Sequence, residues 1–222
     1  SDFTNTNNKN IFSKLSLFKG KKIERFTFEN KIEIDKALNV INKSKFKIED
    51  INSKVHKRNP LAPFTTSTLQ QEASNKLGFG ASRTMRIAQK LYEGINIGSE
   101  TTGLITYMRT DGVQLSSEAI EEVRNEITNR HGKSYIPASP RVYKSKAANA
   151  QEAHEAIRPT SAFMTGNQLL NHSEEETKLY ELIWHQFIAS QMPDAEYLST
   201  SVKINLEDYV FSARGREIVF DG

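Results

Sequence analysis

The chain reads Leu104-Ile105-Thr106-Tyr107-Met108-Arg109-Thr110-Asp111-Gly112 near its middle, between two stretches that have helical periodicity. The first residues of this segment are mostly apolar, and Asp111-Gly112 is typical of a turn, so we expect a short buried extended segment. Residues two apart in an extended segment project to the same face. Tyr107 and Arg109 are therefore expected to lie side by side, where a phenol and a guanidinium can flank one phosphate.

This pair of side chains suits phosphodiester chemistry. A tyrosine that attacks a phosphodiester keeps the bond energy in an aryl ester, so the original bond can be reformed without ATP. The pKa of a phenol is near ~10, so the site must supply positive charge to favour attack and to stabilise the transition state. The residue types alone are weak evidence, because a core tyrosine beside a surface arginine is the commoner arrangement.

The stretches on both sides of the segment are predicted to be helical. Thr68 and Gln71 have the spacing of a capping box, and Gly78 is expected to end the helix that they begin. After a short link, Ser82 is expected to cap a second helix over 82–93. A third helix is expected over 117–131, where the apolar residues recur at helical spacing and a glycine follows.

The second of these helices presents a row of cations. Arg83, Arg86 and Lys90 have the spacing i, i+3 and i+7, which places all three along one helix face. A solvated basic face is the ordinary interpretation of such a row. Because the row lies close in sequence to Tyr107, which suits phosphodiester chemistry, we predict instead that it contacts the phosphates of the substrate.

The two ends of the chain carry the alternating patterns of strands. Strands are expected over 23–28, 46–55, 197–206, 209–214 and 216–220. A helix is expected over 33–43, and a largely buried helix with a Ser173–Glu176 capping box is expected to run to about residue 191. Residues 1–59 carry 14 Lys and Arg against 7 Asp and Glu, and residues 166–222 carry 4 against 10. Opposite charge favours association of the two ends.

These patterns predict an α+β protein with two domains. Residues 1–22 are rich in Asn, Ser and Lys, and we expect them to be a mobile lead-in. Residues 23–59 and 166–222 are expected to form a discontinuous β-bearing domain. A helical domain over 60–165, which carries Tyr107, is expected to be inserted into it. Prolines near both junctions favour hinges at these places.

Composition excludes several classes of protein. The sequence has no cysteine, which excludes a disulfide framework and a thiolate zinc site. It contains no apolar run of the ~20 residues that a membrane-spanning helix needs. We therefore expect a protein of the cytoplasm that does not bind a membrane.

Three segments, in this order, resemble motifs of the type IA DNA topoisomerases. They are Pro63-Phe64-Thr65-Thr66-Ser67-Thr68-Leu69-Gln70-Gln71-Glu72-Ala73, then Ile105-Thr106-Tyr107-Met108-Arg109-Thr110-Asp111, then Gln151-Glu152-Ala153-His154-Glu155-Ala156-Ile157-Arg158-Pro159. The resemblance covers residues 60–222 well and the first sixty residues faintly. It implies the fold of the central domains of prokaryotic type I topoisomerases, with a β-rich arch domain and an inserted helical domain.

The resemblance implies roles for individual residues. Tyr107 takes the place of the nucleophile that becomes joined to a 5′ phosphate of single-stranded DNA. Arg109 matches the arginine that contacts the scissile phosphate, and His154 matches the histidine near the active site. Arg158, taken to lie one helical turn after His154, is expected either to add a phosphate contact or only to pair with Glu155.

The resemblance also implies parts that this sequence lacks. Members of the family use an N-terminal acidic domain that holds Mg²⁺, and nothing here resembles its Asp-x-Asp cluster. The acidic groups near residues 118–122 and 174–176 look like helix N-terminal charge. We therefore expect a fragment without a metal site of its own, which partners with the missing magnesium-binding domain of the same polypeptide and is inactive alone.

The function implied is that of a topoisomerase in the nucleoid. It would cleave one DNA strand through a 5′-phosphotyrosine intermediate, pass a strand, reseal the break and relax negatively supercoiled DNA without ATP. A decatenating topoisomerase and the topoisomerase half of reverse gyrase are alternatives within the family. The alternative from another class is a non-catalytic module that binds single-stranded DNA and uses Tyr107 only to stack on a base.

Overall fold

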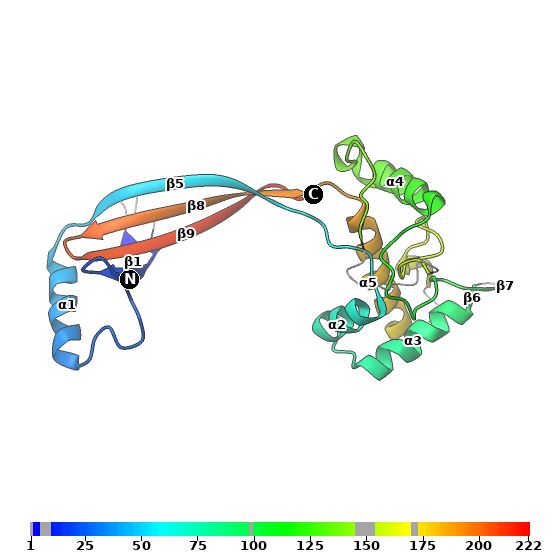
Figure 1. Cartoon of the computed structure of the whole chain (residues 1–222), viewed down its shortest axis with the longest axis horizontal. Coiled ribbons are helices and arrows are strands. Elements are labelled where there is room, and N and C mark those ends of the chain that lie inside the picture. Colours follow the sequence, from blue (N-terminus) through cyan, green and yellow to red (C-terminus); the bar gives the residue numbers. More distant parts are fainter. Residues whose placement is uncertain (1, 5–9, 98–99, 145–153, 170–172) are drawn as a thin grey trace. The chain divides into compact units, whose positions relative to one another are not determined.

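The computed structural model describes residues 2–4, 10–97, 100–144, 154–169 and 173–222. It divides into two compact units (Figure 1). One unit is formed by Ser1–Arg58 together with Ala195–Asp221, and the other by Asn59–Asp194. The first is built around a sheet and the second is mainly helical, so the fold is α+β.

The sheet unit brings together the two ends of the chain. Its five-stranded antiparallel sheet has the order β4-β3-β9-β8-β5. The strands are β3 (Lys14–Phe18), β4 (Lys21–Lys22), β5 (Lys47–Arg58), β8 (Ala195–Leu206) and β9 (Tyr209–Phe220). A separate hairpin joins β1 (Asp2–Thr4) to β2 (Asn10–Phe12). The N-terminal β5 pairs with the C-terminal β8 along its whole length, with a register shift between Ile48 and Asp50.

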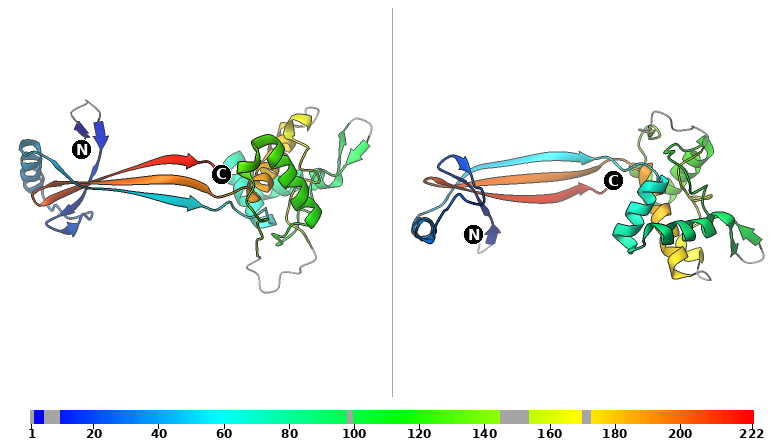
Figure 2. Two further views of the ribbon diagram at one scale, coloured as in Figure 1. Left: turned by 90° about the horizontal axis from the view of Figure 1, so that it is seen from above. Right: turned by 60° about the horizontal axis from the view of Figure 1, so that its bottom comes forward.

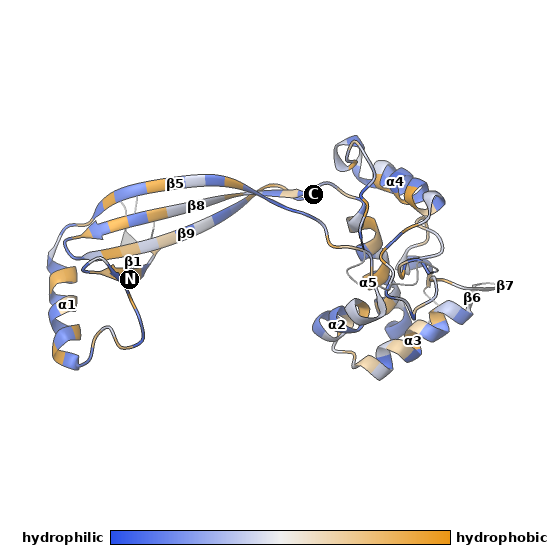
Figure 3. Ribbon diagram, in the orientation of Figure 1, coloured by the Kyte–Doolittle hydropathy of each residue, from blue (hydrophilic) through white to orange (hydrophobic). Residues whose placement is uncertain are grey.

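One face of this sheet is apolar near the β8–β9 turn. Ile204 and Phe211 are buried there with Ala37 of helix α1 (Lys31–Lys43). The ring of Phe18 stacks on that of Tyr209 at 4.9 Å between centroids. Hydrophobic and hydrophilic residues alternate along β5, β8 and β9 (Figure 3), as expected of strands with one apolar face.

The N-terminal part of this unit differs from the sequence-based expectation. Residues 14–22, expected to belong to a mobile lead-in, form β3 and β4 and are part of the sheet. Residues 23–28, expected to be a strand, form a turn closed by a hydrogen bond from Thr27 N to Glu24 O. β3 is fixed by pairing with β9, which is remote in sequence, so local composition could not reveal it. The aromatic ring of Phe28 packs on Phe18 instead of entering the sheet.

The helical unit contains four α-helices among its described residues. They are α2 (Thr66–Leu77), α3 (Ala81–Glu93), α4 (Ser117–His131) and α5 (Glu174–Ser190). Short 3₁₀ helices η1 (Lys133–Tyr135) and η2 (Gly166–Leu169) complete it, with a hairpin of β6 (Ile95–Ile97) and β7 (Glu100–Thr102). This hairpin follows α3 and projects beyond its end (Figure 2). No described helix is long and apolar enough to cross a membrane.

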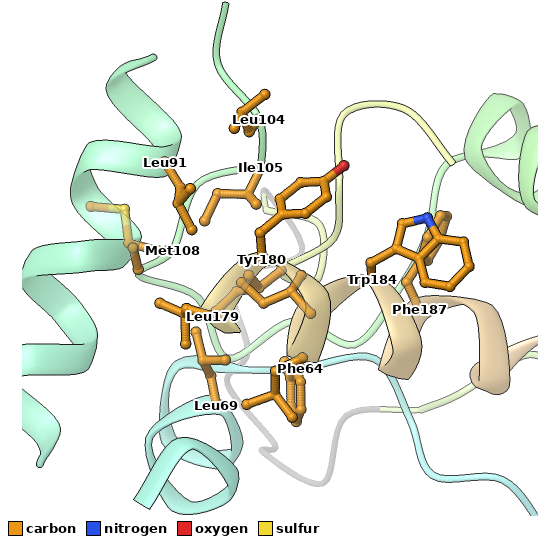
Figure 4. Packing of buried hydrophobic residues seen from close by; sticks show 14 of the residues in the cluster. Phe64, Leu69, Leu91, Leu104, Ile105, Met108, Leu179, Tyr180, Trp184 and Phe187 are labelled. Carbon is orange, nitrogen blue, oxygen red and sulfur yellow. The ribbon is translucent and has the colours of Figure 1, made fainter. Parts of the chain in front are cut away.

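Helix α5 lies at the centre of the helical unit. Leu179, Tyr180 and Ile183 are fully buried among residues of α2, α3 and the Tyr107 segment (Figure 4). The Tyr180 hydroxyl donates to Met164 O at 2.8 Å, and Trp184 Nε1 donates to Ala162 O at 2.8 Å. Burial raises the pKa of the Tyr180 phenol, so this group stays protonated as a donor.

The position of α5 corrects the expected domain boundary. Residues 166–194 were expected in the β-bearing domain but belong to the helical unit, whose C-terminal boundary is at Asp194. The apolar residues of α5 indicated burial and could not indicate the elements that bury it. Those elements are α2, α3 and α4, which all contact α5.

The helix caps agree with the sequence in part. Gly78 ends α2 in the left-handed conformation at φ +69°, and Ser173 and Glu176 form the expected capping box. The cap of α2 is Thr65, which forms a capping box with Thr68, so the expected Thr68–Gln71 pair is wrong by one turn. Gly80 is at the start of α3 in place of Ser82. Thr65, Thr66 and Thr68 all lie near the start of α2, so the sequence alone does not identify the cap. Thr66 Oγ1 is bonded to the backbone of Met108 and Thr110, and Thr65 is the cap.

The core position of α5 predicts the effect of Leu179→Ala. Truncation of this fully buried side chain should lower the free energy of unfolding by about 2–5 kcal/mol. Trp184 is the only tryptophan of the chain and lies in the helical unit, so its fluorescence during urea unfolding reports on this unit. Leu61→Ala, at an exposed position of the same unit, is the control and should cost less than about 0.5 kcal/mol. Equal losses would contradict the central role of α5.

Candidate functional site

Three segments from different parts of the sequence meet around Tyr107. Ile157 N donates to Phe64 O at 2.8 Å, and Thr160 N donates to Leu104 O at 2.9 Å. Isolated antiparallel bridges pair Phe64 with Ile157 and Ile105 with Pro159. Residues 104–106 thus pair with residues 158–160, and Phe64 pairs with Ile157 beside them, without forming a regular strand.

Two threonine hydroxyls fix the backbone of this segment. Thr66 Oγ1 donates to Met108 O at 2.8 Å and accepts from Thr110 N at 2.8 Å. Thr106 Oγ1 donates to Ala156 O at 2.7 Å and accepts from Arg158 N at 3.0 Å. The first threonine begins helix α2 and the second immediately precedes Tyr107. The backbone is therefore restrained on both sides of the tyrosine.

Burial alternates along the Tyr107 segment. Met108 is 1% exposed, whereas Tyr107 is 37% exposed and Arg109 is also exposed. In Figure 4 Ile105 and Met108 lie with the buried side chains around Tyr180. The buried residues hold the segment against the core, and Tyr107 and Arg109 are left on the accessible side, as the alternation of the sequence predicted.

The phenol of Tyr107 lies between two other aromatic rings. The ring of Tyr92, at the C-terminal end of α3, meets it edge-on at 5.4 Å, and the imidazole of His154 lies at 5.4 Å between centroids. Within the described part of the chain, neither the Tyr107 hydroxyl nor the Arg109 guanidinium makes a hydrogen bond or ion pair. The structure therefore brings together Tyr107, Arg109 and His154, with polar atoms available to a ligand.

A glycine sets the position of His154. A Cβ added at Gly112 would lie 2.3 Å from His154 O, which is closer than two such atoms can approach. Ala156 N also donates to Gln114 O at 2.9 Å. Residues 112–114 and 154–156 therefore pack backbone against backbone, and a side chain at residue 112 would displace the histidine.

Arg158 has a structural partner. Its guanidinium contacts Glu155 Oε2 at 2.7 Å and donates to Pro159 O at 2.9 Å, and its side chain is only 13% exposed. Glu155 also accepts from the backbone N of Ser116, the N-cap of α4. Residues 154–159 are extended and not helical, which corrects the expected helical spacing of His154 and Arg158. Of the two expectations for Arg158, the structure shows the pair with Glu155.

Two of the three cations of α3 have carboxylate partners. Arg83 pairs with Glu175 at 2.5 Å and lies over the ring of Phe79, and Lys90 pairs with Glu176 at 3.2 Å. The hydrogen bond from Arg83 lowers the pKa of the Glu175 carboxyl, so this pair is ionised at neutral pH. Arg86 is exposed and has no ion pair among the described residues.

Sequence analysis did not identify Tyr92, Thr66, Thr106 or Gly112 as parts of this site. Thr66 and Thr106 lie within the quoted motifs, but their hydrogen-bond partners are about forty to fifty residues away in sequence. In the described ranges, no group of three or more His, Cys, Asp or Glu side chains is placed to hold a metal ion. The first three residues of the third motif, 151–153, lie outside the described residues.

Comparisons with known proteins agree with these motifs. A sequence model of the DNA topoisomerase family matches residues 2–222. The chain is 47% identical over 221 residues to DNA topoisomerase 1 of Rickettsia bellii, covering 98% of this chain and 28% of that protein. It is 45% identical over 211 residues to DNA topoisomerase 1 of Helicobacter pylori, covering 95% of this chain and 29% of that protein.

A solved structure is also similar. Full-length topoisomerase I from Thermotoga maritima matches with a TM-score of 0.76 and 36% sequence identity. The match covers 96% of this chain and 33% of that chain. The chain thus spans between a quarter and a third of the length of the relatives that it matches.

The close approach at Gly112 makes a prediction about this site. Gly112→Ala should force the 154–156 backbone away and lower the free energy of unfolding by about 1–3 kcal/mol. Gly80→Ala is the matched control, because a Cβ at Gly80 meets nothing within 4 Å. Thermal unfolding followed by circular dichroism checks both variants. A Gly112→Ala protein as stable as the control would show that the approach of the two segments is not required.

Proposed function

This chain belongs to the bacterial type IA DNA topoisomerase family, and from this premise we propose that Tyr107 attacks a phosphodiester of single-stranded DNA. The observation that carries the proposal is the exposed Tyr107 phenol, which lies beside His154 and two residues from Arg109 on a restrained backbone. A phenol with no hydrogen bond to the described residues is available for a reaction partner.

The proposed reaction is a reversible transesterification. The Oη of Tyr107 forms a bond to the 5′ phosphorus, and the bond from phosphorus to the O3′ of the preceding nucleotide breaks. The phenol gives up its proton, and the leaving O3′ takes one up to become a hydroxyl. Attack of the same hydroxyl on the phosphotyrosine reverses each step. One phosphodiester is exchanged for another, so no ATP is needed.

Arg109 and His154 are proposed to act on the charge of this reaction. Negative charge grows on the phosphate oxygens as the phenol attacks, and the planar guanidinium of Arg109 can donate to two of them together. The imidazole of His154 lies 5.4 Å from the Tyr107 ring between centroids, and we propose that it contacts the same phosphate or orients the tyrosine.

In the full-length polypeptide, we propose that this cleavage opens one strand for the passage of another and so relaxes negatively supercoiled DNA. Mg²⁺ is part of this proposal as a requirement of the intact enzyme. We propose that Mg²⁺ is bound outside this chain, in the N-terminal domain that the family resemblance implies, and we assign it no step at Tyr107. We propose that the chain alone is inactive and that the intact enzyme acts on DNA in the nucleoid.

Tyr107→Phe tests the nucleophile in the full-length polypeptide. The change removes one oxygen and keeps the ring, so packing against Tyr92 and His154 should survive while the nucleophile is lost. We expect near-normal binding of single-stranded DNA, no covalent adduct and no relaxation of supercoiled plasmid. Tyr92→Phe, the control at the neighbouring exposed ring, should keep adduct formation. An adduct that persists in Tyr107→Phe would assign the chemistry to another tyrosine, with Tyr92, Tyr135 and Tyr143 the next to test.

Arg109→Lys tests the contact with the phosphate. Lysine keeps the charge and loses the planar pair of donors, so the variant should keep partial activity. We expect the activation free energy of cleavage to rise by about 2–4 kcal/mol, measured as the single-turnover rate of adduct formation. Arg86→Lys, at another exposed arginine of the same unit, should leave the rate unchanged. A wild-type rate in Arg109→Lys would show that charge alone suffices at this position.

A further inference from the structure

The long strands of the sheet unit carry a row of cations on one face. Residues that are directly paired on neighbouring strands lie on the same face of the sheet. The register therefore gives four successive rows of paired residues that cross the strands, and we call these rows ranks. From the β8–β9 turn outward, the ranks are Lys14–Ser212–Lys203–Asp50, Arg214–Ser201–Asn52, Arg216–Ser199–Lys54 and Ile218–Tyr197–His56. We call this surface the cationic face, and its five cations are Lys14, Lys54, Lys203, Arg214 and Arg216.

The opposite face of the same strands has a different character. Its ranks are Ile204 with Ile48 and Phe211, and Val202 with Ile51 and Ala213. That face leads into the buried cluster with α1. The two-residue period of the strands therefore separates an apolar face, whose Ile204 and Phe211 are buried with α1, from a polar face.

The cations of this face have no carboxylate partners. All five are exposed, and in the described ranges of the chain none of them is within ion-pair distance of an Asp or Glu. Asp50 is the one acidic residue in the four ranks. The cations of α3 differ, because Arg83 and Lys90 are neutralised by Glu175 and Glu176. A polyanion that binds the cationic face displaces no internal ion pair.

Aromatic rings and hydroxyls lie among these cations. The imidazole of His56 stacks on the ring of Tyr197 at 5.4 Å and 15° between planes, and the Arg216 guanidinium lies 4.3 Å from the same ring. Ser199 lies between Arg216 of β9 and Lys54 of β5, and its hydroxyl can donate to phosphate oxygens. Alternating cations, hydroxyl donors and aromatic rings are the features that bind single strands without reading sequence.

A cavity lies at the end of the cationic face that is nearest the β8–β9 turn. Its volume is about 700 Å³, and Lys14, Arg214 and the hydroxyls of Ser16 and Ser212 line it. Phe12 also lines the cavity, and its side chain is 75% exposed. An exposed ring beside two cations can stack on a base while the cations contact its phosphate.

From these observations we infer that the cationic face binds the phosphodiester backbone of single-stranded nucleic acid. The strand would run along β9, where Arg214 and Arg216 recur about every 7 Å, from the His56–Tyr197 stack to the Phe12 cavity. This is a second contact with nucleic acid that does not involve Tyr107. It rests on the proposed function only in supposing that the polypeptide meets DNA strands.

The test measures binding of a fluorescent oligodeoxythymidine of about 15 nucleotides to the 222-residue chain by anisotropy. The loss variant is Lys203→Gln with Arg214→Gln and Arg216→Gln. The matched control is Lys31→Gln with Lys36→Gln and Lys43→Gln, which removes the same charge from exposed positions of α1 in the same unit. Thermal melting of each variant checks that it is folded.

We expect the loss variant to bind at least about tenfold more weakly at low salt. Its plot of log affinity against log salt should be flatter by about 2 units, because each lost contact with a single strand contributes about 0.7. The control should keep the slope and lose less than about threefold through its net charge. Equal losses in both variants, or an unchanged slope in the loss variant, would overturn the proposal. A loss seen with duplex DNA only would also overturn it.

A gain variant keeps the proposal testable if the loss variant is poorly folded. Asp50→Asn removes the one carboxylate of the four ranks and should strengthen binding severalfold with a steeper salt dependence. Asp35→Asn on α1 is its control and should have little effect. Wild-type affinity in Asp50→Asn would count against the site. The readout here is oligonucleotide affinity, whereas the tyrosine chemistry is read out as the covalent adduct, so failure of this proposal and failure of the tyrosine chemistry can be distinguished.

Discussion

The hydrogen bonds of Thr66 and Thr106 hold the backbone on which the functional residues of the helical unit depend. Each hydroxyl donates to a carbonyl and accepts from an amide of another segment, so three segments distant in sequence are joined on both sides of Tyr107. The buried side chains of Ile105 and Met108 also hold this backbone against the apolar core. A nucleophile that must release and recapture the same strand end gains from such a fixed position, because misplacement of about 1 Å can cost ~100-fold in rate.

Charge is distributed differently in the two units. In the helical unit most cations are engaged in structure: Arg158 joins Glu155, Arg83 and Lys90 meet the first turn of α5, and Arg141 pairs with Asp194. Arg109, beside Tyr107, has no such partner among the described residues. In the sheet unit the cations of one face are likewise unpaired. The contacts with phosphate that we propose are thus at places where no carboxylate of the described residues competes for the cations.

Much of the fold and site followed from sequence patterns of short range. The two-residue alternation placed Tyr107 and Arg109 on one exposed side, and Gly78 and Ser173 marked helix ends correctly. The errors concern partners distant in sequence. β3 is a strand because β9 pairs with it, and α5 belongs to the helical unit because α2, α3 and α4 cover it. Neither of these relations leaves a local signal.

The central claim is that Tyr107 forms the covalent bond to DNA, and peptide mapping tests it most directly. Full-length polypeptide would be mixed with single-stranded DNA and Mg²⁺, quenched with denaturant, digested with nuclease and protease, and analysed by mass spectrometry. The account predicts a nucleotide joined through its 5′ phosphate to the peptide that contains Tyr107. A nucleotide on a peptide with a different tyrosine, or no adduct under conditions in which plasmid is relaxed, would contradict it.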